Sequence, residues 1–366
     1  MNTQDKIRYG SLQIELTSRC TLRCVTCLRS SHAGLWQERD LSIATFSSLQ
    51  NIFKNTEGVH LQGWGESLML PDLDTYITIA KKHGCRVSFT TNGSLMDEEM
   101  AFRLIRSGVD GITFSMAGGS GEIQDPLRGK NSFEKLDASL SILADGKKKL
   151  HSVTPTVAIS YLLTPATIID LPRAVRWCGK RGVSLFAGVH LTHAADRIQQ
   201  SLQLFPLHEN RYKWILRRAY LQAFISGVQL KMPSLTPSLL PICSKNPINN
   251  LSIAADGSVA PCVFLNTPMD HPVNWLGQVQ SGGFSPLHFG NITTEPLNEI
   301  WNSRAYQDFR NCFMRRVAIY RQALARVGYD LDGIEQLERE KGRICEAFSH
   351  NPPPEPCDGC RKLVGY

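Results

Sequence analysis

Three cysteines lie close together near the start of the chain, at Cys20, Cys24 and Cys27. They follow residues 11–16, where apolar and polar side chains alternate as in a half-buried β-strand. Thiolates are the usual ligands of iron–sulfur clusters, and a cube of four irons bound by only three cysteines keeps one iron without a protein ligand. The C-x3-C-x2-C spacing therefore predicts a loop that wraps a metal cluster and leaves one iron open for chemistry.

The length and composition indicate a globular protein with more than one domain. The chain has 366 residues, of which 42% are hydrophobic and 20% are charged, and these values are ordinary for globular proteins. Forty basic residues against 33 acidic ones give a net charge of +7. The longest basic run, residues 147–149, is interpreted as a solvated loop. So mild a charge does not indicate a nucleic-acid partner, and we expect none.

The sequence shows no targeting or membrane signal. Residues 1–10 are polar and lack the apolar centre of a secretory signal. No apolar run reaches the ~20 residues that a membrane helix needs, so we expect a cytoplasmic protein without a membrane partner. In a reducing compartment the eleven cysteines would not form a disulfide scaffold, and their grouping favours metal binding.

The first half of the chain alternates short β-rich runs with amphipathic helical patterns, which predicts an α/β fold around a parallel sheet. The predicted strands are 11–16, 59–62, 86–91, 111–115, 156–162 and 184–187. The predicted helices are 43–53, 73–83, 97–106, 133–143 and 168–181. Six right-handed βα units form an open or partial barrel, and ligands of such folds lie at the C-terminal ends of the strands. The cysteine loop follows the first strand at that end.

The second half of the chain lacks the regular alternation of strand and helix patterns. Residues 191–242 are expected to be a connector, with a helical pattern at 207–225 and a proline-rich linker at 233–241. A hairpin follows, with strands at 251–254 and 258–263 joined through Asp256 and Gly257. Helices are predicted within 291–303 and over 304–347, before three prolines at 352–354. We therefore divide the chain into a barrel at 1–190, the connector at 191–242 and a small domain at 243–366.

The cysteine loop after the first strand resembles the hallmark of the radical SAM superfamily. This resemblance implies a partial (β/α)6 barrel and a [4Fe-4S] cluster on the three cysteines, whose open iron binds S-adenosyl-L-methionine. It also implies reductive cleavage to methionine and a 5'-deoxyadenosyl radical. Thr26 stands where relatives often carry an aromatic residue. The alternative from the residues alone is a zinc site or buried thiols, which three clustered cysteines without a nearby fourth ligand fit poorly.

The same resemblance implies a set of residues that bind S-adenosylmethionine. Those after the second strand resemble the family's Gly-Gly-Glu element and are Gly63, Trp64, Gly65 and Glu66. Their glycines let the backbone approach a ligand, and the carboxylate suits an ammonium group. Asn92 after the third strand and Ser115 in the fourth are further candidates. The alternative for Asn92 is an ordinary Asn-Gly turn.

The late cysteines resemble the SPASM or twitch extension of this superfamily. The matching features are Cys243, the G-x4-C run from Gly257 to Cys262, the Gly-Asn-Ile at 290–292, and finally Cys357 and Cys360. The resemblance implies that these four cysteines bind one auxiliary [4Fe-4S] cluster. Cys312 and Cys345 stand alone, and a ligand role for Cys345 in place of one of the four stays open. Cys85 and Cys178 are expected to be small buried hydrophobic residues.

The resemblance implies an oxidoreductase that abstracts hydrogen from an unactivated carbon and handles an electron through the auxiliary cluster. Tyr161, His190 and His193 are predicted to face the substrate and to move a proton or hydrogen atom. Only ten residues precede the first strand, which favours a small-molecule or cofactor-like substrate. One alternative is a maturase of a ribosomally made peptide, and another is a zinc-stabilised RNA-binding module without catalysis. An enzyme of this kind also needs an external electron donor such as flavodoxin or ferredoxin.

Overall fold

A twisted sheet runs through the part of the chain that this computed structural model describes, residues 9–204, 211–273, 275, 285–328 and 333–366. The strands are β1 (Tyr9–Ile14), β2 (Thr56–Leu61), β3 (Arg86–Thr91), β4 (Gly111–Met116), β5 (Thr156–Leu163), β6 (Leu185–His190), β7 (Gln229–Lys231), β8 (Leu251–Ile253) and β9 (Val259–Ala260). Their order across the sheet is β7-β6-β5-β4-β3-β2-β1-β8-β9. Neighbouring strands are parallel, except that β8 and β9 are antiparallel.

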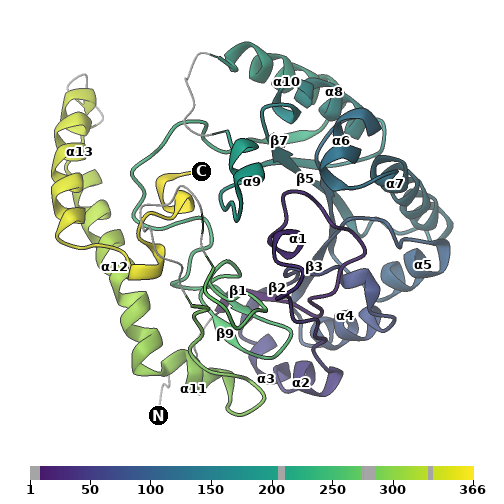
Figure 1. Cartoon of the computed structure of the whole chain (residues 1–366), viewed down its shortest axis with the longest axis horizontal. Coiled ribbons are helices and arrows are strands. Elements are labelled where there is room, and N and C mark those ends of the chain that lie inside the picture. Colours follow the sequence, from purple (N-terminus) through teal and green to yellow (C-terminus); the bar gives the residue numbers. More distant parts are fainter. Residues whose placement is uncertain (1–8, 205–210, 274, 276–284, 329–332) are drawn as a thin grey trace.

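Helices lie along the outer side of the curved sheet and form an arc around it (Figure 1). They are α4 (Leu73–Lys81), α5 (Glu98–Arg106), α6 (Gly121–Arg128), α7 (Ser132–Lys149), α8 (Thr167–Gly179) and α10 (Lys213–Ser226). Strand, helix and parallel strand follow one another along the chain, as in a barrel that is not closed. The expected α/β partial barrel is confirmed.

The two faces of each barrel strand differ in polarity. In β5, every second side chain is buried, from Val157 to Leu163, and these residues pack under the outer helices. The residues between them, such as Ser160, point to the inner side and are partly exposed. The main hydrophobic core therefore lies between sheet and helices, and the inner side of the barrel is free to carry polar groups.

Two predictions about helices were wrong in detail. The predicted helix 43–53 is two short helices, α2 (Ile43–Ser47) and α3 (Gln50–Phe53). Between them, Ser47 and Ser48 turn their hydroxyls back onto the carbonyls of Ile43 and Thr45, which competes with a continuous helix. The basic run 147–149 is the last turn of α7 and not a loop, a position where lysines complement the helix dipole.

The C-terminal region joins the barrel through β8, which pairs with β1 as Leu12 with Leu251. The predicted hairpin is present with shorter strands, and Gly257 takes the positive φ of +86° that its turn requires. The helices that follow are α11 (Leu297–Asn302), α12 (Arg304–Leu324) and α13 (Gly333–Ser349), of which α12 and α13 lie side by side (Figure 1). Two short 3-10 turns, η2 (Glu355–Cys357) and η3 (Arg361–Val364), end the chain.

The expected connector adds to the barrel. Its strand β7 extends the sheet beyond β6, and α10 packs on α8. Part of its predicted helix 207–225 lies outside the described residues, and the rest belongs to α10. None of the helices in the described residues has the length and apolar character to cross a membrane.

Candidate active site

The cysteine loop, residues 20–27, follows β1 and leads into the short helix α1 (Leu28–Ser31). Its three thiols form no disulfide and are half-buried. Burial, with smaller contributions from the neighbouring Cys24 and Cys20, raises the pKa of the Cys27 thiol to about 11. Burial also raises the pKa of Cys20. Such thiols become thiolate ligands when a bound cation offsets the cost of the buried charge, as a metal cluster does.

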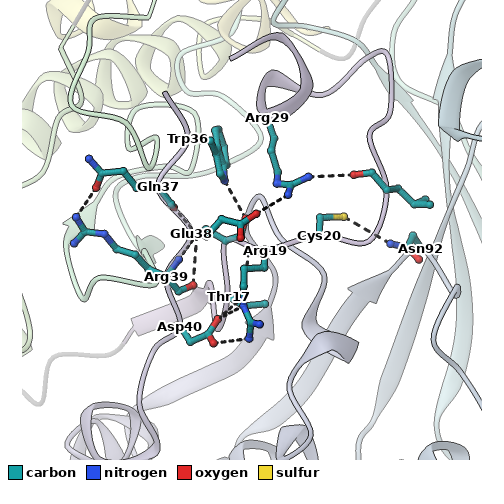
Figure 2. A network of polar contacts seen from close by, with 12 residues as sticks. Thr17, Arg19, Cys20, Arg29, Trp36, Gln37, Glu38, Arg39, Asp40 and Asn92 are labelled. Atoms are coloured by element: carbon teal, nitrogen blue, oxygen red, sulfur yellow. Dashed lines mark hydrogen bonds and ion pairs between the residues drawn. The ribbon is translucent and has the colours of Figure 1, made fainter. Parts of the chain in front are cut away.

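The segment before α2 holds one side of the loop in place (Figure 2). Arg19, which precedes the first cysteine, pairs with Asp40 at 2.5 Å. Arg29 in α1 donates to the carbonyl oxygen of Leu22 at 3.2 Å and pairs with Glu38 at 2.8 Å. Arg19 and Arg29 therefore fix both ends of the loop against one segment, which contains Glu38 and Asp40.

The other side of the loop rests on Gln199, a residue that the sequence analysis missed. It lies in α9 (Arg197–Ser201) and is 1% exposed. Its Nε2 donates to the carbonyl oxygens of Val25 at 3.0 Å and Cys27 at 3.2 Å, and lies 2.8 Å from Ser31 Oγ. A lone glutamine carries no sequence signal, since only the fold brings α9 to the loop.

The turn after β2 crosses the end of β1 at very close range. It contains the predicted residues Gly63, Trp64, Gly65 and Glu66. A Cβ on Gly63 would lie 2.3 Å from Glu15 Oε1, and one on Gly65 would lie 2.0 Å from Thr17 O. Both positions therefore favour glycine, because a Cβ would meet the side chain of Glu15 at Gly63 and the backbone of Thr17 at Gly65.

Glu15 ties this turn to the C-terminal hairpin. Its Oε1 accepts a hydrogen bond from Trp64 N at 2.5 Å, and its Oε2 accepts one from Ala255 N at 3.2 Å. The side chain is 2% exposed, and burial raises its pKa to about 7, against the lowering effect of these two N–H groups. One buried carboxyl group thus links the turn after β2 to the region that carries the late cysteines.

Glu66 uses both carboxylate oxygens within the protein. Its Oε1 accepts from Thr91 Oγ1 at 2.7 Å and Leu68 N at 3.1 Å, and its Oε2 accepts from Asn92 N at 2.7 Å. Asn92 in turn directs its side-chain amide at the cysteine loop, 3.8 Å from Cys20 Sγ (Figure 2). The structure therefore brings the second and third strand ends together at the loop, with Glu66 as the residue that positions Asn92.

Polar side chains line the inner side of the barrel. The two ring nitrogens of His60 lie 2.8 Å from Ser88 Oγ and 2.8 Å from Gln62 Oε1. Gln13 donates from Nε2 to the carbonyl oxygen of Gln62 at 3.1 Å and accepts from Lys245 Nζ at 3.1 Å. Burial lowers the pKa of His60, so its ring is neutral at pH 7. A hydrogen-bonded network therefore crosses the lumen from β3 to the C-terminal region.

The lumen is hollow as well as polar. A cavity of about 850 Å³ enters it at the N-terminal ends of the strands and reaches Thr113 and Ala158. Ser115, predicted to bind S-adenosylmethionine, lies on β4 in register with Ser160 of β5, and both are partly exposed on the inner side. Ser115 therefore points to the inner side of the barrel, since side chains of a strand alternate, and its contact with S-adenosylmethionine stays a prediction.

The four late cysteines come together around one small cavity, although they lie far apart in sequence. They are Cys243, Cys262, Cys357 and Cys360. Burial raises the pKa of Cys262, raises that of Cys357 well above its ordinary value and raises that of Cys360 to about 11. The same cavity is lined by Phe264 and Lys362.

Both cysteine groups fit iron–sulfur clusters in their donor chemistry, because each brings three or four thiols together. Within the described residues, no three His, Cys, Asp or Glu side chains gather as they would around a single metal ion. A cube of four irons is wider than one ion and holds its thiolates farther apart. The late group also faces the half-buried ammonium of Lys362, which suits an anionic cluster.

Two of the three predicted substrate-side residues face away from the lumen. Tyr161 is fully buried on the helix side of β5, where its hydroxyl donates to Thr167 O at 2.8 Å. His190 is buried on the outer side of β6, with Nε2 2.8 Å from Ser234 O. The alternation of side chains along β5 and β6 is the reason, and the predicted orientation of both residues was wrong.

His193 lies at the late cysteines and not at the mouth near the first loop. Its Nε2 is 3.9 Å from Cys360 Sγ, and its ring stacks on Phe264 with centroids 4.0 Å apart. The loop after β6 carries it there, a direction that the sequence does not specify. The prediction that it faces the same mouth as the first cysteines was therefore wrong.

The remaining cysteines lie outside the two groups. Cys85 and Cys178 are 1% and 0% exposed, which confirms that they are small buried residues of the core. Cys312 on α12 donates to the carbonyl oxygen of Asp308 in its own helix at 3.4 Å, and Cys345 is exposed on α13. Neither lines the cavity of the late cysteines.

Comparisons with known proteins agree with this geometry. The model of the radical SAM superfamily matches residues 14–190, and that of the SPASM iron–sulfur cluster-binding domain matches residues 243–323. The tungsten-containing aldehyde ferredoxin oxidoreductase cofactor-modifying protein of Pyrococcus furiosus is 25% identical over 317 residues, 82% of each chain. The mycofactocin maturase MftC of Mycobacterium tuberculosis is 31% identical over 172 residues, 47% of this chain and 42% of that one.

A solved structure shares the fold. Streptococcus suis SuiB bound to S-adenosylmethionine superimposes with a TM-score of 0.60 over 83% of this chain and 68% of that chain, at 15% identity. The matched segments contain the loop at the end of β1 and two of the four late cysteines. The chain belongs to the radical SAM superfamily and carries a C-terminal SPASM domain.

Proposed function

We propose that this enzyme binds a polar small-molecule or cofactor-like substrate in the barrel lumen, abstracts a hydrogen atom from it, and completes an oxidation or a bond formation. In this proposal Cys20, Cys24 and Cys27 hold the [4Fe-4S] cluster that binds S-adenosylmethionine. The auxiliary [4Fe-4S] cluster is held by Cys243, Cys262, Cys357 and Cys360. When bound, these groups supply the one-electron chemistry that an unactivated C–H bond requires.

One observation supports this division above others: polar groups on the inner side of the barrel connect to a residue that lines the cavity of the late cysteines. At one side, Asn92 at the end of β3 contacts Cys20. At the other side, Lys245 donates to Gln13 in the lumen, and both residues line a cavity of about 210 Å³ together with Cys262. A substrate held by these inner-side groups would lie close to the auxiliary centre, and radical chemistry requires that such a substrate be kept from bulk water.

The residues around the first loop are assigned to S-adenosylmethionine by their positions. Asn92 and Ser115 offer an amide and a hydroxyl at neighbouring strands, and the turn of Gly63 to Gly65 offers backbone groups. Glu66 already accepts three hydrogen bonds from the protein, so its role is to position this turn and Asn92. The chain's own groups thus orient the cofactor and hold the loop, and none of them needs to change protonation.

The lumen favours a substrate with polar groups. Its described side chains include an imidazole, two amides and several hydroxyls, and Glu57, Arg86 and Asp110 line the cavity at the N-terminal ends of the strands. The amides of Gln13 and Gln62 would bind neutral polar groups of the substrate. A relative that covers 82% of both chains is named for modifying a cofactor, which supports a cofactor-like substrate.

The second candidate is the modification of a ribosomally made peptide. The identity to MftC, which is named as a maturase, favours it. That match spans less than half of either chain, however, whereas the cofactor-modifying relative matches 82% of both. We therefore rank the small or cofactor-like substrate first.

The direct test is anaerobic reconstitution with iron and sulfide, followed by reduction with S-adenosylmethionine present. The enzyme is expected to release 5'-deoxyadenosine, and the Cys20→Ala, Cys24→Ala, Cys27→Ala variant is expected to release none. Dithionite is replaced by flavodoxin or ferredoxin to test the proposed protein electron donor. Absence of deoxyadenosine from a protein with full iron content would contradict the proposed function.

A further inference from the structure

The cavity of the late cysteines is surrounded by groups that favour negative charge. Besides the four cysteines, its lining includes His193, Lys245, Phe264 and Lys362. Among the described residues, no aspartate or glutamate lines it. A cube of four irons with four thiolate ligands carries net negative charge, and that charge together with hydrogen bonds to the sulfurs sets its reduction potential.

Lys362 is the strongest sign of an anion at this place. Its side chain is half-buried, and the described residues offer its ammonium neither a hydrogen bond nor an ion pair. Its contact is with the ring of Phe264, whose centroid lies 5.3 Å from Nζ. A buried cation without an acidic partner is costly, and it is retained where an anion compensates it.

Lys245 approaches the same ring from nearby, with Nζ 5.9 Å from the Phe264 centroid. Its one hydrogen bond in the described residues goes to the neutral Gln13 Oε1 at 3.1 Å, so its charge is also without a carboxylate. It lines two cavities with Cys262, the one among the cysteines and the one that reaches the lumen. Two ammonium groups therefore face the four thiols.

Two N–H groups point at the sulfurs themselves. The backbone N–H of Phe264 donates to Cys262 Sγ at 3.3 Å. His193 Nε2 lies 3.9 Å from Cys360 Sγ, and its Nδ1 lies 2.8 Å from Thr192 Oγ1. A thiolate only accepts, so with Cys360 bound to the cluster Nε2 would carry the proton and Nδ1 would accept from the threonine hydroxyl. Thr192 thus orients His193 as a donor to Cys360.

We propose that Lys362, Lys245 and His193 raise the reduction potential of the auxiliary cluster, which poises that centre to accept an electron. The physical reason is that reduction adds one negative charge, and nearby cations and N–H donors stabilise the reduced form more than the oxidised one. This inference rests on the proposed ligand set of the four late cysteines. It assigns these three residues a role in positioning and tuning, and no contact with the substrate.

The test is a potentiometric titration of the reconstituted full-length protein, followed by electron paramagnetic resonance. Lys362→Met is expected to lower the auxiliary midpoint potential by at least 59 mV, which is tenfold in the one-electron equilibrium constant. Lys362→Arg, which keeps the charge, is expected to stay close to the unsubstituted protein. His193→Phe keeps an aromatic ring on Phe264 and removes the donor, so it is also expected to lower the potential.

Three controls make the result specific. Lys180→Met removes an exposed lysine at the end of α8 and is expected to shift neither potential. The first cluster, recognised by the change of its signal on addition of S-adenosylmethionine, is expected to keep its potential in every variant. Where Lys362→Met loses its auxiliary iron, Lys245→Met provides the same measurement with the same expected direction.

The inference would be overturned if the auxiliary potential stayed unchanged at full iron content both in a lysine variant, Lys362→Met or Lys245→Met, and in His193→Phe. That result would leave the proposed function intact. A protein that binds only about four irons before any substitution has no auxiliary cluster, which would refute the ligand set itself. The iron content therefore separates the failure of the inference from the failure of the function on which it rests.

Discussion

The side-chain amide of Gln199 donates a hydrogen bond to the carbonyl oxygen of Val25 at 3.0 Å, across 174 residues of sequence. Because Gln199 also binds the carbonyl of Cys27, Gln199→Leu would leave two loop carbonyls without their donor, at about 1–3 kcal/mol for each buried group. We expect this variant to retain less iron at the first site after desalting. Gln203→Leu is the matched control, since Gln203 is also buried and donates to Leu191 O instead.

Iron loss of equal size in both glutamine variants would contradict the role of Gln199, because it would point to a general loss of stability. The auxiliary signal serves as an internal reference, since it should persist in Gln199→Leu.

Glu66→Gln tests the positioning of Asn92. The carboxylate accepts from Thr91, Leu68 and Asn92, and an amide would set an N–H donor against one of these donors. We expect the affinity for S-adenosylmethionine to fall by roughly tenfold to a hundredfold, which corresponds to about 1–3 kcal/mol. Equilibrium dialysis of the reconstituted protein measures it, with the exposed Glu122→Gln as the control. An unchanged affinity would refute the role of Glu66.

Tyr161→Phe tests the correction made to the substrate-side residues. Because the hydroxyl of Tyr161 donates to Thr167 O in the core and is far from polar lumen groups, its removal should cost about 0.5–1.5 kcal/mol of stability. The yield of 5'-deoxyadenosine should stay unchanged. Urea unfolding and product analysis of the same preparation measure both quantities. A Tyr161→Phe variant that has its full iron content but releases no 5'-deoxyadenosine would show that Tyr161 takes part in the reaction.

Glu15→Gln tests the buried carboxyl group between β1 and the hairpin. The pKa of Glu15 is raised from 4.5 to about 7 in the folded state, so the folded protein binds its proton more tightly than the unfolded chain does. This contribution to stability is fully present below pH 4.5 and is lost as the pH rises through about 7. We expect the urea midpoint to fall less between pH 5 and pH 7.5 in Glu15→Gln than in the unsubstituted protein. If the urea midpoints of the two proteins fell equally between pH 5 and pH 7.5, Glu15 would not titrate in that pH range.

Much of the barrel could be predicted because its signals are local. The strand predicted at 86–91 is β3, and the other five predicted strands overlap β1, β2, β4, β5 and β6. The pairing of β1 with β8 could not be predicted, since it depends on contacts across 239 residues and not on a pattern within either strand. The orientation of Tyr161 was available from the sequence: it shares its face with the apolar Ile159 and Leu163.

The site was predictable where residue type and spacing carry the chemistry, as in the two cysteine groups. It was not predictable where a neutral side chain acts through the fold. Gln199, Gln13 and Glu15 have no motif, and their partners come from distant segments. His193 was recognised as a functional candidate, but a loop residue has no periodicity that tells its direction, and it faces the late cysteines.

The central claim is that two separate cysteine groups hold two clusters, and counting iron tests it most directly. Anaerobically reconstituted protein should bind about eight irons per chain, as expected for two four-iron cubes. Replacing Cys20, Cys24 and Cys27 by alanine should leave about four irons, and so should replacing Cys243, Cys262, Cys357 and Cys360. A variant of either kind that binds no iron, or one that keeps all of it, would contradict the account.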